Sequence, residues 1–224
     1  MTLLNYIIYI TFCILLQLLV EVKSQTTIFK PDLREGHTAT FINDKLYILG
    51  GAIPPHTNKV RPKETFLYLD CSAPFNTSEL EWIDLSDLSN TNNVVPPHYF
   101  AAAVKGGSSN DTLILYAGES LGAEQMSLVY AFNTLNNTWC VPILAGIPPT
   151  AKVFTTPVVD YNGLMYLYRG ATSVSANGTY TSDMFILDTI NLSFKIANSD
   201  NALSPRVEFG AVLLPNKDII YMGM

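Results

Sequence analysis

The feature that most constrains the fold is a short apolar run that ends on glycine and recurs along the chain. It first appears at 45–51 (KLYILGG), and it returns at 112–118 (TLILYAG), 164–170 (LMYLYRG) and 218–223 (DIIYMG). β-branched and aromatic residues stopped by glycine are typical of a buried strand followed by a tight turn. Recurrence of such a run predicts one structural unit repeated several times, as in arrays and propellers.

Each copy of the run belongs to a longer unit with room for four short strands. We expect strands at 37–42, 45–49, 64–70 and 79–85, then at 99–104, 112–117, 127–133 and 138–141, and then at 153–159, 164–168, 183–188 and 192–196. A fourth unit has only two expected strands, at 209–214 and 219–222. An aromatic residue marks the fourth strand, with 57 residues from Trp82 to Trp139 and 55 from Trp139 to Phe194. This pattern is typical of β-propeller blades.

Over about residues 34–224 the chain resembles the kelch-repeat family. The residues that carry the resemblance are Gly50-Gly51, Tyr68 and Trp82, then Ala117-Gly118, Tyr130 and Trp139, then Arg169-Gly170 and Phe194, and finally Gly223. The resemblance implies an all-β fold, an incomplete kelch-type β-propeller of three four-stranded blades plus half of a fourth. The blades would cover about 34–90, 96–145 and 150–198, with a half-blade at 204–224, in one domain from 25 to 224.

The marker residues of the repeat are expected to be structural. Paired glycines allow a turn where a Cβ would clash, and Trp82 and Trp139 would close each blade by packing against its neighbour. The chain also looks like the secreted or surface kelch proteins of fungi and the propellers of attractin and galactose oxidase. The last likeness leaves open a fragment of a copper oxidase, an enzyme that needs two His and two Tyr at the propeller axis, one Tyr linked to Cys.

The N-terminal segment predicts a secreted product. Residues 3–20 are almost wholly apolar, and Val22-Lys23-Ser24 precedes Gln25 with residues that fit a signal-peptidase site. Residues 1–24 are therefore interpreted as a signal peptide, and no membrane span is expected after its cleavage. A membrane anchor that is not cleaved is the alternative, because about eighteen apolar residues nearly span a bilayer.

Five Asn-x-Ser/Thr sites agree with an extracellular route: Asn76, Asn110, Asn136, Asn177 and Asn191. Each lies in or beside an expected turn, where a glycan would remain in solvent. Cys13 lies inside the predicted signal peptide, so Cys71 and Cys140 remain in the mature chain. A disulfide between these two cysteines is permitted by the compartment but not required by their positions.

No catalytic or metal-binding motif is found in the sequence, so no cofactor is expected. The net charge of −6, with no run of Lys or Arg, argues against nucleic acid as a partner. The three histidines do not form a cluster with metal-ligand spacing. His37 and His98 are interpreted as equivalent positions of successive units, which favours a structural or rim role.

The loops after the glycine stops are the segments that could bind a partner. The longest, 54–63 (PPHTNKVRPK), presents His56, Lys59, Arg61 and Lys63. Loops 120–125 and 173–181 follow the same stop in the next two units, so all three are expected on one face. The predicted function is a secreted or cell-surface, non-enzymatic kelch module that binds a protein or a glycan. The alternatives are the copper-oxidase fragment and a truncated product without independent function.

Closure of the propeller is the physical difficulty of this prediction. Propellers usually hide their sheet edges by joining the first and last blades into a ring, and three and a half blades do not close a ring of the usual kelch size. Either further blades continue the chain, or self-association with another copy completes the ring, or the chain folds poorly.

Overall fold

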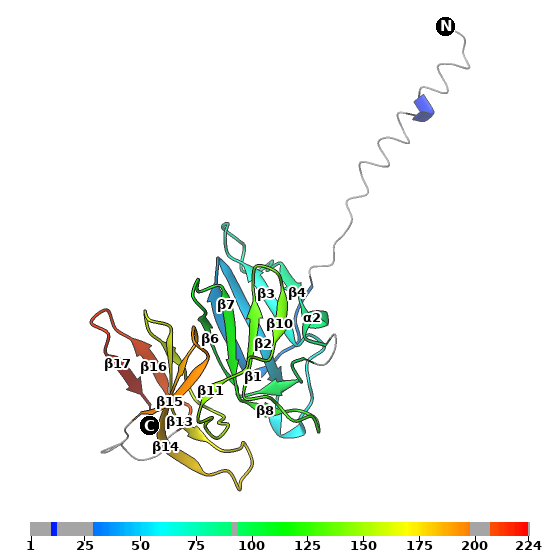
Figure 1. Cartoon of the computed structure of the whole chain (residues 1–224). Coiled ribbons are helices and arrows are strands. Elements are labelled where there is room, and N and C mark those ends of the chain that lie inside the picture. The colour runs from blue at the N-terminus through cyan, green and yellow to red at the C-terminus, as the bar shows by residue number, and fades with distance from the viewer. Residues whose placement is uncertain (1–9, 13–28, 91–93, 198–206, 224) are drawn as a thin grey trace.

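The structure, a computed structural model, describes residues 10–12, 29–90, 94–197 and 207–223. The predicted signal peptide lies almost entirely outside these residues. Within the described ranges, no helix is long and apolar enough to cross a membrane. Nearly all of the regular structure is β, in sheets that follow one another along the chain (Figure 1).

The first sheet has four antiparallel strands in chain order: β1 (Glu35–Ile42), β2 (Lys45–Ala52), β3 (Phe66–Asp70) and β4 (Trp82–Asp84). Asn43 and Asp44 join β1 to β2 with φ of 49° and 59°, the two positive values that a type I′ hairpin requires. A 3-10 turn, η1 (His56–Asn58), lies in the loop after β2, and a short helix, α2 (Ser86–Asn90), follows β4.

The later sheets repeat this plan. The second contains β6 (Ala102–Gly106), β7 (Thr112–Tyr116), β9 (Val129–Asn133) and β10 (Thr138–Cys140), beside a small pair of β5 (His98–Tyr99) and β8 (Glu119–Ser120). The third contains β12 (Val158–Val159), β13 (Leu164–Ala171), β14 (Tyr180–Asp188) and β15 (Ser193–Ala197), with β11 (Ala145–Gly146) parallel to β15 as a fifth strand. β16 (Gly210–Leu213) and β17 (Ile219–Met222) form a hairpin. The predicted all-β fold of three blades and half of a fourth is confirmed, with β11 as an addition.

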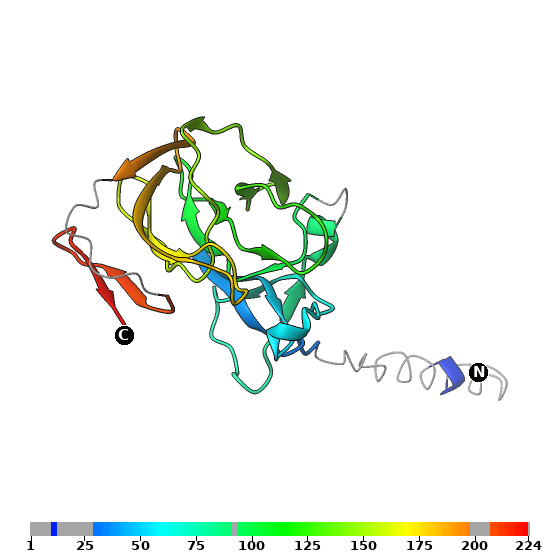
Figure 2. The same cartoon turned by 90° about the horizontal axis from the view of Figure 1, so that it is seen from below.

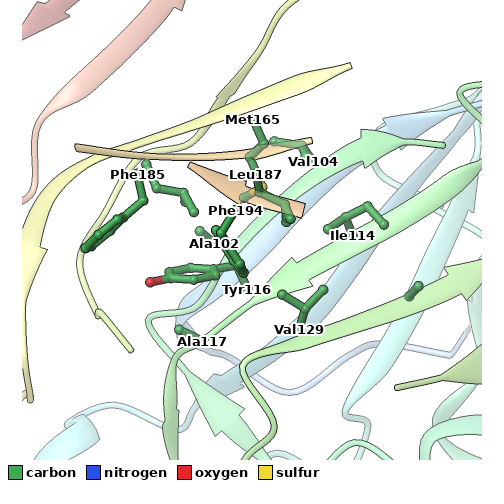
Figure 3. Close-up of a cluster of buried hydrophobic side chains, with 12 residues drawn as sticks. Ala102, Val104, Ile114, Tyr116, Ala117, Val129, Met165, Phe185, Leu187 and Phe194 are labelled. Atoms are coloured by element: carbon green, nitrogen blue, oxygen red, sulfur yellow. The ribbon is translucent and has the colours of Figure 1, made fainter. Parts of the chain in front are cut away.

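Successive sheets pack face to face, because strand alternation sends one set of apolar side chains to each face. Tyr47 and Leu49 of β2 lie with Phe66 of β3 against Leu113 and Phe132 of the second sheet. The opposite face of the second sheet packs on the third through a second cluster, which includes Ala102, Val104, Ile114, Tyr116, Val129, Met165, Leu167, Phe185, Leu187 and Phe194 (Figure 3). The core of the molecule is therefore a series of layers between blades.

The three aromatic residues that mark the outer strands do not share one environment. Trp139 packs on Phe66 of the first sheet at a ring-centroid distance of 5.4 Å. Phe194 faces Tyr116 of the second sheet at 6.2 Å. Trp82 is half-buried on the face of the first sheet that points away from the second, where it lines a hollow with the segment before β1.

The two ends of the sheets are built differently. At one end, here called the turn end, lie the connections from the first strand of each sheet to the second and from the third to the fourth; these are short turns except for the segment 71–81 between β3 and β4. Neighbouring sheets are tied there by hydrogen bonds from Asn43 Nδ2 to Thr134 Oγ1 (3.5 Å) and from the Gly107 amide to Thr189 Oγ1 (3.3 Å). The opposite end, here called the loop end, carries the longer loops after the second strands. It lies at the bottom of Figure 1 and faces the viewer in Figure 2.

Candidate functional site

Loops from three consecutive blades meet at the loop end around one carboxylate, that of Glu119. Lys59 Nζ of the first loop lies 3.1 Å from Glu119 Oε1. Glu119 Oε2 accepts hydrogen bonds of 2.9 Å from Ser173 Oγ and from the Val174 amide of the third loop. Partial burial raises the pKa of Glu119, but the hydrogen bonds from Val174, Lys59 and Ser173 outweigh it, so that its pKa lies below the ordinary value. This charged hub holds the three loops together.

The four residues singled out in the first loop have different surroundings. His56 Nδ1 lies 2.9 Å from Glu35 Oε1, and the His56 ring meets the Phe100 ring edge-on at 5.1 Å. Lys59 is engaged by the Glu119 hub. Arg61 and Lys63 are exposed at the rim. Two of the four therefore fix the loop, and the other two present positive charge to solvent.

A second feature of the loop end is a repeated backbone position at the start of the first strand of each blade or a few residues before it. It is occupied by Gly36, Phe100, Phe154 and Glu208, with φ of 67°, 52°, 57° and 53°. A positive φ is uncommon for a bulky residue. The Phe100 ring lies against Gly36, 3.0 Å from where a Cβ would stand, and the Phe100 and Phe154 rings are 4.2 Å apart. This row of residues, here called the axial row, was not predicted from the sequence.

Two residues before each member of the axial row stands a basic residue. Arg34 lies 3.5 Å from Glu64 Oε2 and donates to the Glu64 carbonyl at 2.8 Å. Lys152, 1% exposed, lies 2.6 Å from Asp183 Oδ1. Burial lowers the pKa of Lys152, although Asp183 acts in the opposite direction. These two blades thus begin with a buried cation that bonds to an acidic side chain on the same blade.

His98 occupies this basic position in the second blade, so its predicted equivalence with His37 is wrong. The equivalent of His37 is Ala101, because Thr38 faces Leu49 as Ala102 faces Tyr116. His98 is 2% exposed, and its Nδ1 lies 2.8 Å from the Pro96 carbonyl. Burial lowers the pKa of His98 to about 4, so the ring is neutral at pH 7.

The basic position and the axial row had a signal in the sequence. Four tripeptides begin with a basic residue and end at the axial-row position, where the residue varies: Arg34-x-Gly36, His98-x-Phe100, Lys152-x-Phe154 and Arg206-x-Glu208. Residue 206 lies outside the described residues, so the equivalence of the fourth tripeptide rests on Glu208 alone.

His98 also explains one of the repeat glycines. A Cβ on Gly50, whose φ is 71°, would stand 2.7 Å from both the carbonyl oxygen and the Nε2 of His98. The equivalent positions in the next blades hold Ala117 and Arg169, with φ of 52° and 59°. The Arg169 side chain is buried and lies over the Tyr168 ring at 4.5 Å. The first glycine of the pair is thus required in the first blade only.

All five predicted glycosylation sites are exposed. Asn76, Asn136 and Asn191 lie between the third and fourth strands of their blades, and Asn110 lies in the turn between β6 and β7. These four asparagines therefore belong to the turn end. Asn177 belongs to the loop end, in the loop between β13 and β14.

Cys71 and Cys140 are both free, so the disulfide that the sequence left open is not formed in the structure. Among the described residues, no group of three His, Cys, Asp or Glu side chains is placed to hold a metal ion.

The hollows in the surface of the described residues include three that could receive a partner. One of about 550 Å³ lies beside the 71–81 segment at the turn end, and one of about 540 Å³ lies beside Trp82. A smaller one, of about 300 Å³, lies at the loop end between the loop after β13 and the segment before β16. We consider the smallest the better candidate for a partner site, because it adjoins both the axial row and the third of the loops gathered at Glu119.

Comparison with known proteins agrees with the fold. A family model described as the KLHDC2/KLHL20/DRC7 Kelch-repeats domain matches residues 36–224. No curated protein matches the chain.

Proposed function

Because the chain belongs to the kelch-repeat family, whose repeats generally serve as protein-interaction modules, we propose that it is a secreted or cell-surface module that binds a protein or a glycan without catalysing a reaction. The observation that carries this proposal is the gathering of three loops at Glu119. A surface built from loops on a rigid scaffold can vary for recognition while the blades stay unchanged. The loop end is therefore the proposed binding surface.

The distribution of glycosylation sites supports both the compartment and the choice of end. Four of the five sequons belong to the turn end, and all five asparagines are exposed. Glycans there would cover the turn end and leave most of the loop end open. Expression in eukaryotic cells, with N-terminal sequencing and peptide mapping after deglycosylation, tests this arrangement. We expect secretion, a mature chain that begins at Gln25 and glycans at the turn end; retention of an intact N-terminus in the membrane would contradict secretion.

Binding through the loop end is tested with a pair of charge-matched variants. Arg61→Ala with Lys63→Ala removes two exposed cations from the first loop. Lys105→Ala with Lys195→Ala removes two exposed cations from the strands of the other blades. Each secreted, biotinylated protein is applied to a glycan array and to cell surfaces. We expect the first pair to reduce binding and the second to leave it unchanged; equal binding by both pairs would refute the loop end as the site.

The non-enzymatic part of the proposal has its own test. Purified protein incubated with copper and a panel of sugars is assayed for hydrogen peroxide. No peroxide above that of the buffer is expected, and sustained production would favour the copper-oxidase alternative.

Apolar side chains on the outer face of the β16–β17 hairpin support a further contact. Val212 faces Ile220 across this hairpin, and Met222 faces Gly210 on the same side. The three apolar side chains are 43%, 41% and 58% exposed. We propose that another sheet, from a second copy or from further blades, covers them. Mass measurement of the purified chain in solution tests the first source, and a compact monomer at all concentrations would refute self-association.

A further inference from the structure

The 300 Å³ pocket at the loop end combines aromatic rings with a carboxylate. Phe154 and Tyr180 contribute the rings, Glu208 contributes the acid, and Ser173 and Ser175 contribute hydroxyl groups. This volume is at the small end of the range for ligand pockets. It suits a single side chain or a small group inserted by a partner.

Phe154 is held in the pocket at a cost in backbone strain. Its φ of 57° is one that bulky residues rarely adopt, and Phe100 beside it has the same conformation. Both rings are only half-buried, so they contribute less to the core than the fully buried aromatic residues between blades. The first blade uses Gly36 at the same position. Strained residues are concentrated at binding and active sites, and the Phe100–Phe154 pair is therefore interpreted as a contact surface.

The charge of the pocket indicates the sign of its ligand. Among the described residues that line it, Glu208 is the one with a formal charge, and it is exposed. Nearby cations are held elsewhere, since Lys152 is paired with Asp183 and the Arg169 guanidinium lies over the Tyr168 ring. A carboxylate beside aromatic faces attracts a cation through both charge and the ring quadrupole.

We propose that this pocket receives a basic side chain, Lys or Arg, from a peptide segment of the partner. The inference rests on the proposed function, because it specifies what the loop end binds. A peptide with a basic side chain is favoured over a neutral sugar because the sugar would leave the exposed Glu208 carboxylate without a counter-charge, and because the Ser173 hydroxyl is already engaged. Ser173 Oγ donates to Glu119 at 2.9 Å and lies 3.1 Å from Ser175 Oγ.

Saturation-transfer NMR on the full secreted chain tests the proposal with small probes. The probes are the N-acetyl amides of arginine, lysine and glutamine, together with methyl glucoside and methyl galactoside. We expect the arginine and lysine probes to receive saturation and the glutamine probe to receive none. Glu208→Gln should weaken binding of the arginine and lysine probes about fivefold, because it removes the charge of the side chain and keeps its shape. Glu124→Gln is the matched control, since Glu124 is an exposed acid on the neighbouring loop, and it should have no effect.

Phe154→Gly separates a binding role from a structural one. Glycine tolerates the positive φ at no steric cost. The variant should therefore retain a cooperative thermal unfolding transition but no longer bind the arginine and lysine probes. Equal binding of the glutamine probe, or undiminished binding by Glu208→Gln, would overturn the basic-side-chain inference. Binding of the glycosides in place of the basic probes would overturn it too and leave the loop end as a binding surface. If the loop end were not a binding surface at all, the Arg61→Ala, Lys63→Ala variant would instead bind as well as the Lys105→Ala, Lys195→Ala variant.

Discussion

Protonation of His98 should make the fold sensitive to acid. The ring is 2% exposed, and burial lowers its pKa to about 4, whereas an unfolded chain has a histidine pKa of 6.5. The neutral ring therefore stabilises the folded state fully above pH 6.5, and this contribution is lost as the pH falls toward 4. The full loss amounts to about 3 kcal/mol, at 1.36 kcal/mol for each pKa unit. About 2 kcal/mol of it should be lost by pH 5.

The variant His98→Asn isolates this contribution. An asparagine can donate to the Pro96 carbonyl as His98 Nδ1 does, but it does not titrate. Free energies of unfolding from urea titrations at pH 7.5 and pH 5 should fall by about 2 kcal/mol more in the wild-type chain than in the variant.

A second histidine serves as the control. Partial burial also lowers the pKa of His37, with Arg34 acting in the same direction, but His37 on β1 is far more exposed than His98. His37→Asn should therefore remove less of the acid sensitivity than His98→Asn. Equal losses of stability with pH in the wild type and in His98→Asn would refute the burial argument.

Two further predictions concern the blade interfaces, both measured as free energies of unfolding in urea. Gly50→Ala should destabilise the fold by about 2–4 kcal/mol, because its Cβ would stand 2.7 Å from the His98 carbonyl oxygen at a φ of 71°. Gly210→Ala is the control: the nearest atom to its Cβ would lie at 3.7 Å, so this change should alter stability by less than about 1 kcal/mol. Phe132→Ala should cost about 3–5 kcal/mol, because Phe132 is fully buried between blades. Phe41→Ala, at a residue 53% exposed, should cost less than about 1 kcal/mol, and similar losses in the two Phe variants would contradict the interface assignment.

The fold was predictable because one pattern recurs in the same order along the chain: an apolar strand, a glycine that ends it and an aromatic residue in the fourth strand. The strand bounds were less predictable where backbone conformation overrides side-chain pattern. The expected strand at 153–159 shortens to β12 (Val158–Val159), because Phe154 has a positive φ that an extended strand does not permit. The expected strand at 183–188 lengthens to β14 (Tyr180–Asp188), because pairing with β13 continues beyond a bulge near Gly170.

The site was harder to predict because the number of residues between the axial row and the glycine stop differs from blade to blade. Axial-row residues stand 15, 18, 16 and 15 positions before the last glycine of their own repeats, Gly51, Gly118, Gly170 and Gly223. Counting from the glycine stop therefore misaligns the second blade. The place of each histidine ahead of an expected first strand is no better guide, because His37 stands 14 positions before Gly51 and His98 stands 20 before Gly118. Only the strand pairing, with Thr38 opposite Leu49 and Ala102 opposite Tyr116, aligns the blades correctly.

Once the blades are aligned, the repeat itself distinguishes scaffold from recognition. The basic position keeps its chemistry in Arg34 and Lys152, each held by an acidic partner, and its third member, His98, is buried. A position that buries a polar side chain must supply that side chain with a partner, which limits the residues that it can hold. The axial row shows the opposite behaviour: its backbone conformation is constant, but its side chains range from none to phenylalanine to glutamate. Because the blades fold with any of these side chains, folding alone does not determine which one is present. The strained, half-exposed phenylalanines and the exposed Glu208 are therefore better explained by contact with a partner than by the stability of the propeller.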